Sequence, residues 1–249
     1  MSLRAGGVGL FYFAGHGVES KGKNFLIPLA ASMDNEFELE DEAVDANSVL
    51  RAMEEAGEMV GIRDRAGFEA HVAHWEAADD VAAATLPVGY VRSLEGADSL
   101  VTLAHLERAW ADGLRAIGPA HYGPGVYAQG TSTTGPFPAR GRELLRLAGE
   151  LGLILDVTHL SDECLWEALE RYRGPVWASH HNARALVPHQ RQLADDMFRA
   201  LVARDAVVCV CLDGWMMTPG WERGKTTPAS AGLTLARLAD HIDHWCQLA

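Results

Sequence analysis

Residues 153–182 read LILDVTHLSDECLWEALERYRGPVWASHHN, and they contain two strand-like segments on either side of a helix-like one. Leu153–Val157 and Pro175–Ser179 are short apolar runs, whereas Asp162–Tyr172 carries apolar residues at helical spacing. Strand, helix and strand in this order are typical of a right-handed βαβ unit with parallel strands. The first strand leads to His159 and the second to His180, so both imidazoles are expected at the same edge of the sheet.

The same alternation continues on both sides of this stretch. Further strands are predicted at Val88–Leu94, Leu114–Ala120 and Val207–Leu212, and further helices at about 102–112, 139–151, 194–203 and 234–249. Five strands in residues 88–249 match the rate of a (β/α)₈ barrel, in which one unit takes about 30 residues. An open doubly wound sheet is the alternative, but no Gly-x-Gly-x-x-Gly follows the first of these strands. The predicted fold class is therefore α/β, with a partial TIM-type barrel.

The first 87 residues have a different rhythm. Strands are predicted at Val8–Ala14 and Asn24–Leu29, a solvated loop at Asp34–Asp45, and a helix at Ala46–Ala56 that stops before Gly57. Residues 58–87 are rich in alanine and charge and predict a helix followed by a linker. The expected organisation is a small α/β segment at 1–57, a helical linker at 58–87 and the barrel portion at 88–249.

Composition and charge exclude several classes of protein. Of the 249 residues 48% are hydrophobic, and the formal net charge is −13, which gives no general electrostatic reason to bind nucleic acid or anionic lipid. No apolar run approaches the ~20 residues of a transmembrane segment. The first ten residues show no secretory signal, so a cytoplasmic location is the default expectation. The four cysteines match neither a zinc knuckle nor a CxxC pair.

Acidic and imidazole side chains follow the predicted strands. They are Glu95, His121, His159, His180 and Asp213. In a barrel the carboxyl ends of the strands share one mouth, where catalytic and metal-binding side chains collect. A single histidine at a strand end is more often a structural residue, but four of five strands ending in Glu or His indicate a metal site. Carboxylate and imidazole are ligands for Zn²⁺.

Five ordered blocks carry a resemblance to a known family. The blocks are Ser93–Asp98, Gly113–His121, Leu155–Asp162, Ala178–Leu186 and Arg191–Asp196. Together they make residues 59–249 resemble the membrane (renal) dipeptidases, the M19 metallopeptidases, in a truncated form. The resemblance implies a TIM-like barrel with a binuclear zinc site that hydrolyses dipeptides.

The resemblance also implies roles for particular residues. Glu95 corresponds to the carboxylate that bridges the two metals, and His159 and His180 correspond to ligands of the second metal. His121 corresponds to a histidine that contacts the substrate near the scissile carbonyl, and Arg191 to the arginine that binds the substrate carboxylate. An arginine fork suits the free carboxylate of a dipeptide, and metal activation of water suits its hydrolysis.

Other residues near these blocks are expected to have lesser roles. His181, Asn182 and Arg184 are interpreted as neighbours of the ligands or as loop residues, and His189, His241 and His244 as surface or helix-face residues. Asp213 matches no ligand of the family, which favours a structural or pocket-wall role.

Parts of the family's pattern are missing. No predicted strand ends in the His-x-Asp that holds the family's first metal, and the chain stops at Ala249, before the strand that carries a further Asp ligand. Glu95, His159 and His180 remain, and three ligands with an open position form a legitimate mononuclear zinc site. One zinc ion is therefore expected, against two in the intact family. An unclosed barrel exposes sheet edges, which favours a homo-oligomer.

The N-terminal segment resembles a different family. Residues 9–18, GLFYFAGHGV, followed by Gly22–Pro28, look like the caspase-like (C14, metacaspase) peptidases. There the histidine of Gly-His-Gly is the base for a cysteine nucleophile, which corresponds to His16. None of the four cysteines stands in the family's nucleophile motif, so His16 is interpreted as the remnant of a dyad.

Two hypotheses on function follow. The first is a zinc-dependent metallodipeptidase, impaired by the loss of part of the binuclear site, with a dipeptide as its substrate. The alternative is a catalytically inactive truncated or chimeric protein with a caspase-like N-terminal fragment. Bound zinc and hydrolysis of a dipeptide panel would discriminate between them.

Overall fold

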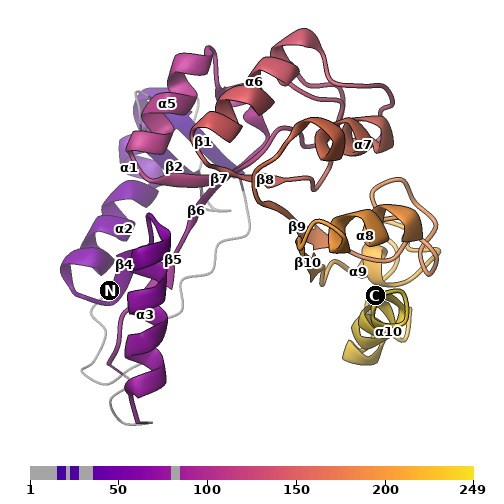
Figure 1. Ribbon diagram of the computed structural model, residues 1–249. Coiled ribbons are helices and arrows are strands. Elements are labelled where there is room, and N and C mark those ends of the chain that lie inside the picture. Colours follow the sequence, from indigo (N-terminus) through magenta and orange to yellow (C-terminus); the bar gives the residue numbers. More distant parts are fainter. Residues whose placement is uncertain (1–15, 21–22, 28–35, 80–84) are drawn as a thin grey trace. The chain divides into compact units, whose positions relative to one another are not determined.

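The computed structural model describes residues 16–20, 23–27, 36–79 and 85–249 (Figure 1). The chain divides into two compact units, Met1–Val91 and Arg92–Ala249, and each is described by itself. The strand predicted at 8–14 lies outside the described residues. No helix in the described part of the chain combines the length and apolar character needed to cross a membrane.

The first unit contains two small sheets. The antiparallel sheet has the order β1-β2-β3, formed by β1 (His16–Ser20), β2 (Lys23–Ile27) and β3 (Val44–Asp45). A two-stranded parallel sheet pairs β4 (Met59–Gly61) with β5 (Val88–Tyr90). The helices are η1 (Glu36–Glu38), α1 (Leu39–Glu42), α2 (Ala46–Glu55) and α3 (Arg65–Ala77).

The sequence predicted some of these elements and not others. The helix α2 confirms the helix expected at 46–56, and it begins where the Asp45 carboxylate accepts from the backbone N–H groups of Asn47 and Ser48. The acidic stretch expected to be a loop is helical over residues 36–42, where Leu39 is buried and three acidic residues lie in the first turn of α1. Acidic side chains favour the start of a helix through its dipole.

The second unit is built on a five-stranded parallel sheet. Its order is β10-β9-β8-β7-β6, so each strand pairs with its neighbour in the sequence. The strands are β6 (Arg92–Glu95), β7 (Leu114–Gly118), β8 (Ile154–Asp156), β9 (Val176–His181) and β10 (Val207–Val210). This order never reverses, which distinguishes the sheet from a doubly wound one. The described strands form an open sheet. They do not close into a barrel, whereas the sequence predicted part of one.

Helices connect successive strands and supply the other half of the core. They are η2 (Ala97–Ser99), α5 (Leu103–Ala111), α6 (Ala139–Glu150), α7 (Asp162–Arg171), α8 (Asp195–Val202), α9 (Gly214–Met217) and α10 (Leu235–Cys246). In Figure 1, α5, α6 and α7 lie together along one side of β7 and β8. Leu106, Leu144 and Leu165 from these helices pack against Ile117 and Leu155 of the sheet. Each fully buried leucine contributes about 1.5–3 kcal/mol.

One predicted detail of this unit is wrong. The single strand predicted at 88–94 is two strands, since β5 pairs with β4 in the first unit and β6 pairs with β7 in the second. The helix α7 is capped by Ser161, whose hydroxyl accepts from the Cys164 N–H, and not by Asp162. The Asp162 carboxylate instead forms a two-pronged ion pair with Arg184, at 2.7 Å for each bond.

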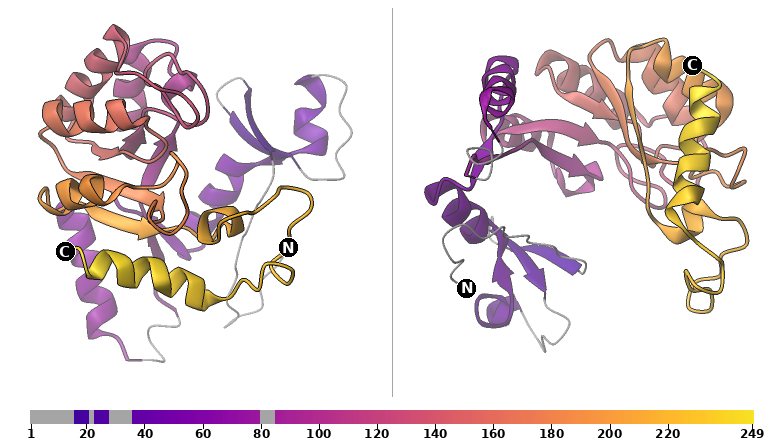
Figure 2. Two further views of the ribbon diagram at one scale, coloured as in Figure 1. Left: turned by 90° about the vertical axis from the view of Figure 1, so that its right-hand side faces the viewer. Right: turned by 90° about the horizontal axis from the view of Figure 1, so that it is seen from below.

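A buried amide ties the end of β9 to the end of β10. Asn182 is fully buried, and its Nδ2 donates to the carbonyls of Cys211 and Met216 at 2.9 and 3.0 Å. Its Oδ1 accepts from the Cys211 N–H at 3.0 Å. Gln192 adds a second bond to the Met216 carbonyl. The loop after β10 is therefore held by side chains of the segment after β9, beside α10, which Figure 2 shows in yellow.

We expect Asn182→Ala to destabilise the chain by about 2–4 kcal/mol, because it removes a fully buried amide and leaves the N–H and the carbonyl of the half-buried Cys211 without their side-chain partner. Urea denaturation followed by circular dichroism measures this change. Gln247→Ala, which also removes an amide but at an exposed position, is the matched control and should change stability by less than about 0.5 kcal/mol. Equal stability of the two variants would contradict the role given to Asn182.

Candidate metal centre

Three side chains from three strands of the second unit converge at the carboxyl ends of those strands. Glu95 is the last residue of β6, His180 lies near the end of β9, and His159 follows β8. The Glu95 Oε1 lies 3.2 Å from the His159 Nε2 and 3.1 Å from the His180 Nε2. The two Nε2 atoms are 3.3 Å apart. Of the five acidic or imidazole residues expected at strand ends, the sheet thus brings Glu95, His159 and His180 together.

The three atoms fit a tetrahedral metal ion. Four ligands at about 2.0–2.1 Å from zinc lie about 3.3–3.4 Å from one another. The observed separations of 3.1–3.3 Å are close to one face of such a tetrahedron. In the described part of the chain, Glu95, His159 and His180 are the group of acidic, imidazole or thiol side chains that meets the geometry of a metal site.

The charges of the cluster also suit a cation. Hydrogen bonds from His159 and His180 hold the pKa of the Glu95 carboxyl well below its ordinary value, so the carboxylate is ionised at neutral pH. Burial lowers the pKa of His159, and the nearby Arg191 charge adds to this effect. A neutral imidazole beside an ionised carboxylate is the protonation state that metal binding requires.

The backbone before each histidine is held by one buried carboxylate. Asp156 is the last residue of β8, and its Oδ1 accepts from the N–H groups of Thr158 and Ser179 at 3.0 and 3.1 Å. Directly after Thr158, the backbone of His159 adopts a φ of 69°, in the left-handed region. A histidine there stores strain of about 1–3 kcal/mol, which is a feature of functional sites.

His121 lies on the solvent side of the cluster. Its ring centroid is 4.5 Å from that of His159 and 5.0 Å from that of Tyr122. The loop that follows is folded against it, because the Thr131 N–H donates to the His121 carbonyl at 2.9 Å. Gly130 makes this approach possible, since a Cβ at that position would lie 2.2 Å from the His121 carbonyl oxygen.

Arg191 brings a buried positive charge to the same place. Only 2% of the residue is exposed, and its Nη2 donates to the His180 carbonyl at 2.8 Å and lies 3.4 Å from the His159 Nε2. Its Nε and Nη1 are buried without a hydrogen-bond partner. Unsatisfied buried donors are costly, so a guanidinium in this state is suited to an anionic ligand.

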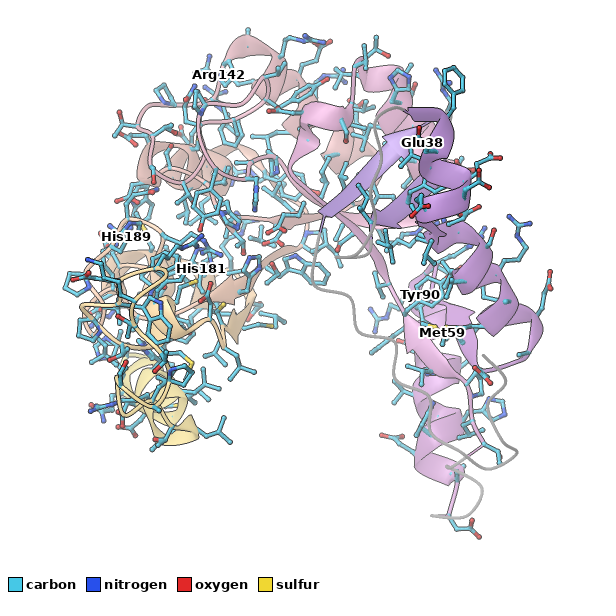
Figure 3. All side chains as sticks on the ribbon, turned by 180° about the vertical axis from the view of Figure 1, so that it is seen from behind. Glu38, Met59, Tyr90, Arg142, His181 and His189 are labelled. Carbon is cyan, nitrogen blue, oxygen red and sulfur yellow. The ribbon has the colours of Figure 1, made fainter. Side chains whose placement is uncertain are left out.

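The remaining predicted residues lie away from the three ligand atoms. Figure 3 labels His181, the last residue of β9, and His189, which is exposed and stands edge-on to Trp215. His244 is half-buried and bonded to Asp195, and Asp213 is exposed before α9. The structure describes the backbone of His16 as the first residue of β1, whereas its side chain lies outside the described part.

His241 was predicted to be a surface or helix-face residue. It lies on the buried face of α10 and not at the surface. Its Nδ1 accepts from the Ala183 N–H at 3.1 Å, and its Nε2 lies 3.3 Å from the Met217 carbonyl. Both ring nitrogens therefore join α10 to the segments after β9 and β10, and they are not available to a metal.

Sequence reasoning missed three hydroxyl groups that surround the cluster. Thr131 Oγ1 lies 2.9 Å from the His159 Nδ1, and Ser179 Oγ lies 2.8 Å from the His180 Nδ1. Thr158 Oγ1 accepts from the Ser179 hydroxyl at 3.2 Å. Ser179 directly precedes a strand-end histidine, which is a usable signal in retrospect, but Thr131 stands in a Gly/Pro/Thr-rich loop that has no periodic pattern.

Comparison with known proteins identifies the family. A family model described as membrane dipeptidase (peptidase family M19) matches residues 3–249. The chain belongs to the membrane dipeptidase family. The match includes residues 3–57, and no comparison supports the caspase-like fragment predicted there, which stays a prediction.

Curated proteins resemble this chain over part of its length. A Klebsiella pneumoniae protein from the pqqA 5′ region is 31% identical over 147 residues, which are 56% of this chain and 52% of that protein. A dipeptidase of Claviceps purpurea is 26% identical over 164 residues, which are 63% of this chain and 36% of the relative. The chain thus spans about half or less of the length of these curated relatives.

A solved structure shares the fold. It is a metallo peptidase from Rhodobacter sphaeroides liganded with a phosphinate mimic of the dipeptide L-Ala-D-Ala. The TM-score is 0.63 and the sequence identity 21%, over 81% of this chain and 56% of that one. At this identity the likeness shows the α/β fold alone.

Proposed function

We propose that this chain carries the metal-binding part of a metallodipeptidase. The observation that carries the proposal is the convergence of Glu95, His159 and His180 with separations of 3.1–3.3 Å, beside the unpaired donors of Arg191. Membership of the membrane dipeptidase family supports it. The five-stranded sheet is then an arc of a TIM-type barrel, in which the strand ends form the mouth.

Zinc is the ion that this set of ligands favours. One carboxylate and two imidazoles are the protein ligands of several catalytic zinc sites, which keep a fourth position open. Bound there, zinc supplies Lewis acidity that allows a water molecule to ionise near neutral pH. Glu95 and the two histidines hold the ion, and the Thr131 and Ser179 hydroxyls contact the outer nitrogen of each ring.

The other side chains of the site act on the substrate. Arg191 binds the free carboxylate of a dipeptide through its unpaired Nε and Nη1, because an arginine fork matches a carboxylate in geometry and charge. His121 lies above the His159 ring, where its imidazole donates a hydrogen bond to the carbonyl oxygen that gains charge during attack. These two residues orient the peptide bond relative to the cluster.

Several further features of the chain remain predictions. They are a division at residues 57 and 87, a remnant base at His16, and association into a homo-oligomer through the sheet edges. The exposed fractions of Val207 and Leu212 near the β10 edge, 60% and 65%, are consistent with association there. Size-exclusion chromatography with light scattering measures the oligomeric state.

The proposal predicts zinc binding and hydrolysis of dipeptides with a free carboxylate. The purified chain should take up about one zinc ion per chain, measured by elemental analysis, and release amino acids from a panel of dipeptides, measured by mass spectrometry. Removal of the metal with a chelator should abolish turnover, and added Zn²⁺ should restore it. Zinc-supplemented protein that neither binds metal nor hydrolyses a dipeptide would favour the inactive alternative.

A further inference from the structure

The outer nitrogen of each histidine in the cluster contacts a hydroxyl group. Thr131 Oγ1 lies 2.9 Å from the Nδ1 of His159, and Ser179 Oγ lies 2.8 Å from the Nδ1 of His180. In most metal sites this nitrogen donates to a carboxylate, a backbone carbonyl or water. A carboxylate and a carbonyl only accept hydrogen bonds, whereas a hydroxyl both donates and accepts.

The two hydroxyls come from different parts of the second unit and are fixed independently. Thr131 is fully buried, and its backbone is bonded on both sides, from its N–H to the His121 carbonyl and from the Gly123 N–H to its own carbonyl, each at 2.9 Å. Ser179 lies in β9, and its N–H donates to Asp156. Neither hydroxyl can therefore move far from the ring that it contacts.

We propose that Thr131 and Ser179 are positioning residues that keep the Nε2 atoms of His159 and His180 directed at Glu95 in both imidazole tautomers. The proposal rests on the proposed function, since it takes Nε2 as the ligating atom. It concerns ring orientation and adds no residue that touches the substrate.

The contacts explain why hydroxyls suit this position. Without metal, an Nε2–H of His159 donates to the Glu95 carboxylate 3.2 Å away, so the Thr131 hydroxyl donates to the Nδ1. When Nε2 ligates a metal, the Nδ1 carries the proton and the same hydroxyl accepts it. Rotation about the Thr131 C–O bond is sufficient to change between the two arrangements, and the ring does not turn.

The contacts of His180 allow the same reversal along a short chain of groups. Ser179 Oγ lies 3.2 Å from Thr158 Oγ1, which lies 3.4 Å from the Nδ1 of His181. If the His180 Nδ1 donates to Ser179, the Ser179 hydroxyl donates to Thr158; if Ser179 donates to His180, the Thr158 hydroxyl donates to Ser179. Each hydroxyl keeps a partner in both directions, so burial costs no unpaired donor.

The first test measures zinc affinity in hydroxyl variants. Thr131→Val keeps the shape of the side chain and removes the hydroxyl, and we expect it to weaken zinc binding about 10–100-fold in a chelator competition assay. Thr131→Ser restores the hydroxyl and should recover most of the affinity. Ser179→Ala is the equivalent change at His180 and should show a loss in the same range.

Thr133→Val is the matched control. Thr133 stands in the same loop, and its hydroxyl donates to the Gly130 carbonyl at 2.6 Å and not to a histidine. If zinc affinity depends on the contact between the Thr131 hydroxyl and the His159 ring, and not on the conformation of the loop alone, Thr133→Val should leave zinc affinity unchanged. An equal loss in Thr131→Val and Thr133→Val, or no loss in Thr131→Val and Ser179→Ala, would overturn the proposal.

The second test observes the His159 imidazole directly, before and after zinc is added. In ¹⁵N-histidine NMR spectra of the metal-free chain at mildly alkaline pH, His159 should be a single tautomer protonated at Nε2, and zinc should convert it to the tautomer protonated at Nδ1. Thr131→Val should keep this tautomer, because Glu95 still accepts the Nε2 proton, but it should broaden or duplicate the His159 signals, because the ring is no longer held in one orientation. His159 signals as narrow and single as those of the wild type would contradict the positioning role. A wild-type chain that binds no zinc would contradict the proposed function, and this spectrum would still decide the role of Thr131.

Discussion

His159→Ala should abolish stoichiometric zinc binding, and with it any dipeptide hydrolysis. The substitution removes one of three ligand atoms that lie 3.1–3.3 Å apart, and the two that remain cannot hold a tetrahedral ion against competition from water. His180→Ala should have the same effect because the two imidazoles have equivalent places in the cluster. Zinc content after dialysis, measured by elemental analysis, reports the change directly.

The control for this prediction is His74→Ala. His74 is exposed in α3 of the first unit, so the same chemical change is made away from the cluster, and zinc content should stay at the wild-type level. Circular dichroism verifies that all three variants keep their secondary structure. Full metal content in both His159→Ala and His180→Ala would show that the proposed ligands are wrong.

Arg191→Met should raise the KM for a dipeptide about 10–100-fold and change kcat much less. A charge-assisted hydrogen bond contributes about 1.5–3 kcal/mol, and the carboxylate bound by Arg191 is present in both the ground state and the transition state. Initial rates over a range of substrate concentrations separate the two constants. Arg146→Met removes an arginine with an exposed ion pair to Glu150 and should leave both constants unchanged.

Dipeptide amides sharpen the test of Arg191. An amide lacks the negative charge, so the wild-type chain should hydrolyse it less efficiently than the free acid. Arg191→Met should treat the two substrates alike, because it has lost the group that distinguishes them. If the variant discriminates against the amide as strongly as the wild type does, another residue binds the carboxylate.

Much of the second unit could be predicted because its periodicity is unambiguous. The runs that became β7, β8 and β9 are short, apolar and separated by amphipathic helices, so their parallel pairing follows from general rules of connection. The segment 88–94 was predicted as one strand because no turn signal separates Val88–Tyr90 from Arg92–Glu95. Nothing local indicates that the first half pairs with Met59–Gly61 and the second with β7.

The convergence of the three candidate ligands could be predicted from the sequence, whereas the contacts that hold their side chains in place could not. Glu95, His159 and His180 stand at strand ends, where parallel topology places them together whatever the intervening loops do. The contact of Thr131 with His159 depends on how the loop after β7 folds back. No periodic pattern in the sequence indicates that conformation. The burial of His241 likewise depends on where α10 packs, and its helical position alone suggested a surface residue.

The unequal exposure of the three ligands gives metal exchange a direction. The Glu95 side chain is 46% exposed and that of His180 33%, whereas that of His159 is only 4% exposed. If the proposed site binds zinc, an incoming ion, or a chelator that removes it, would therefore meet the Glu95 carboxylate first and the His159 imidazole last.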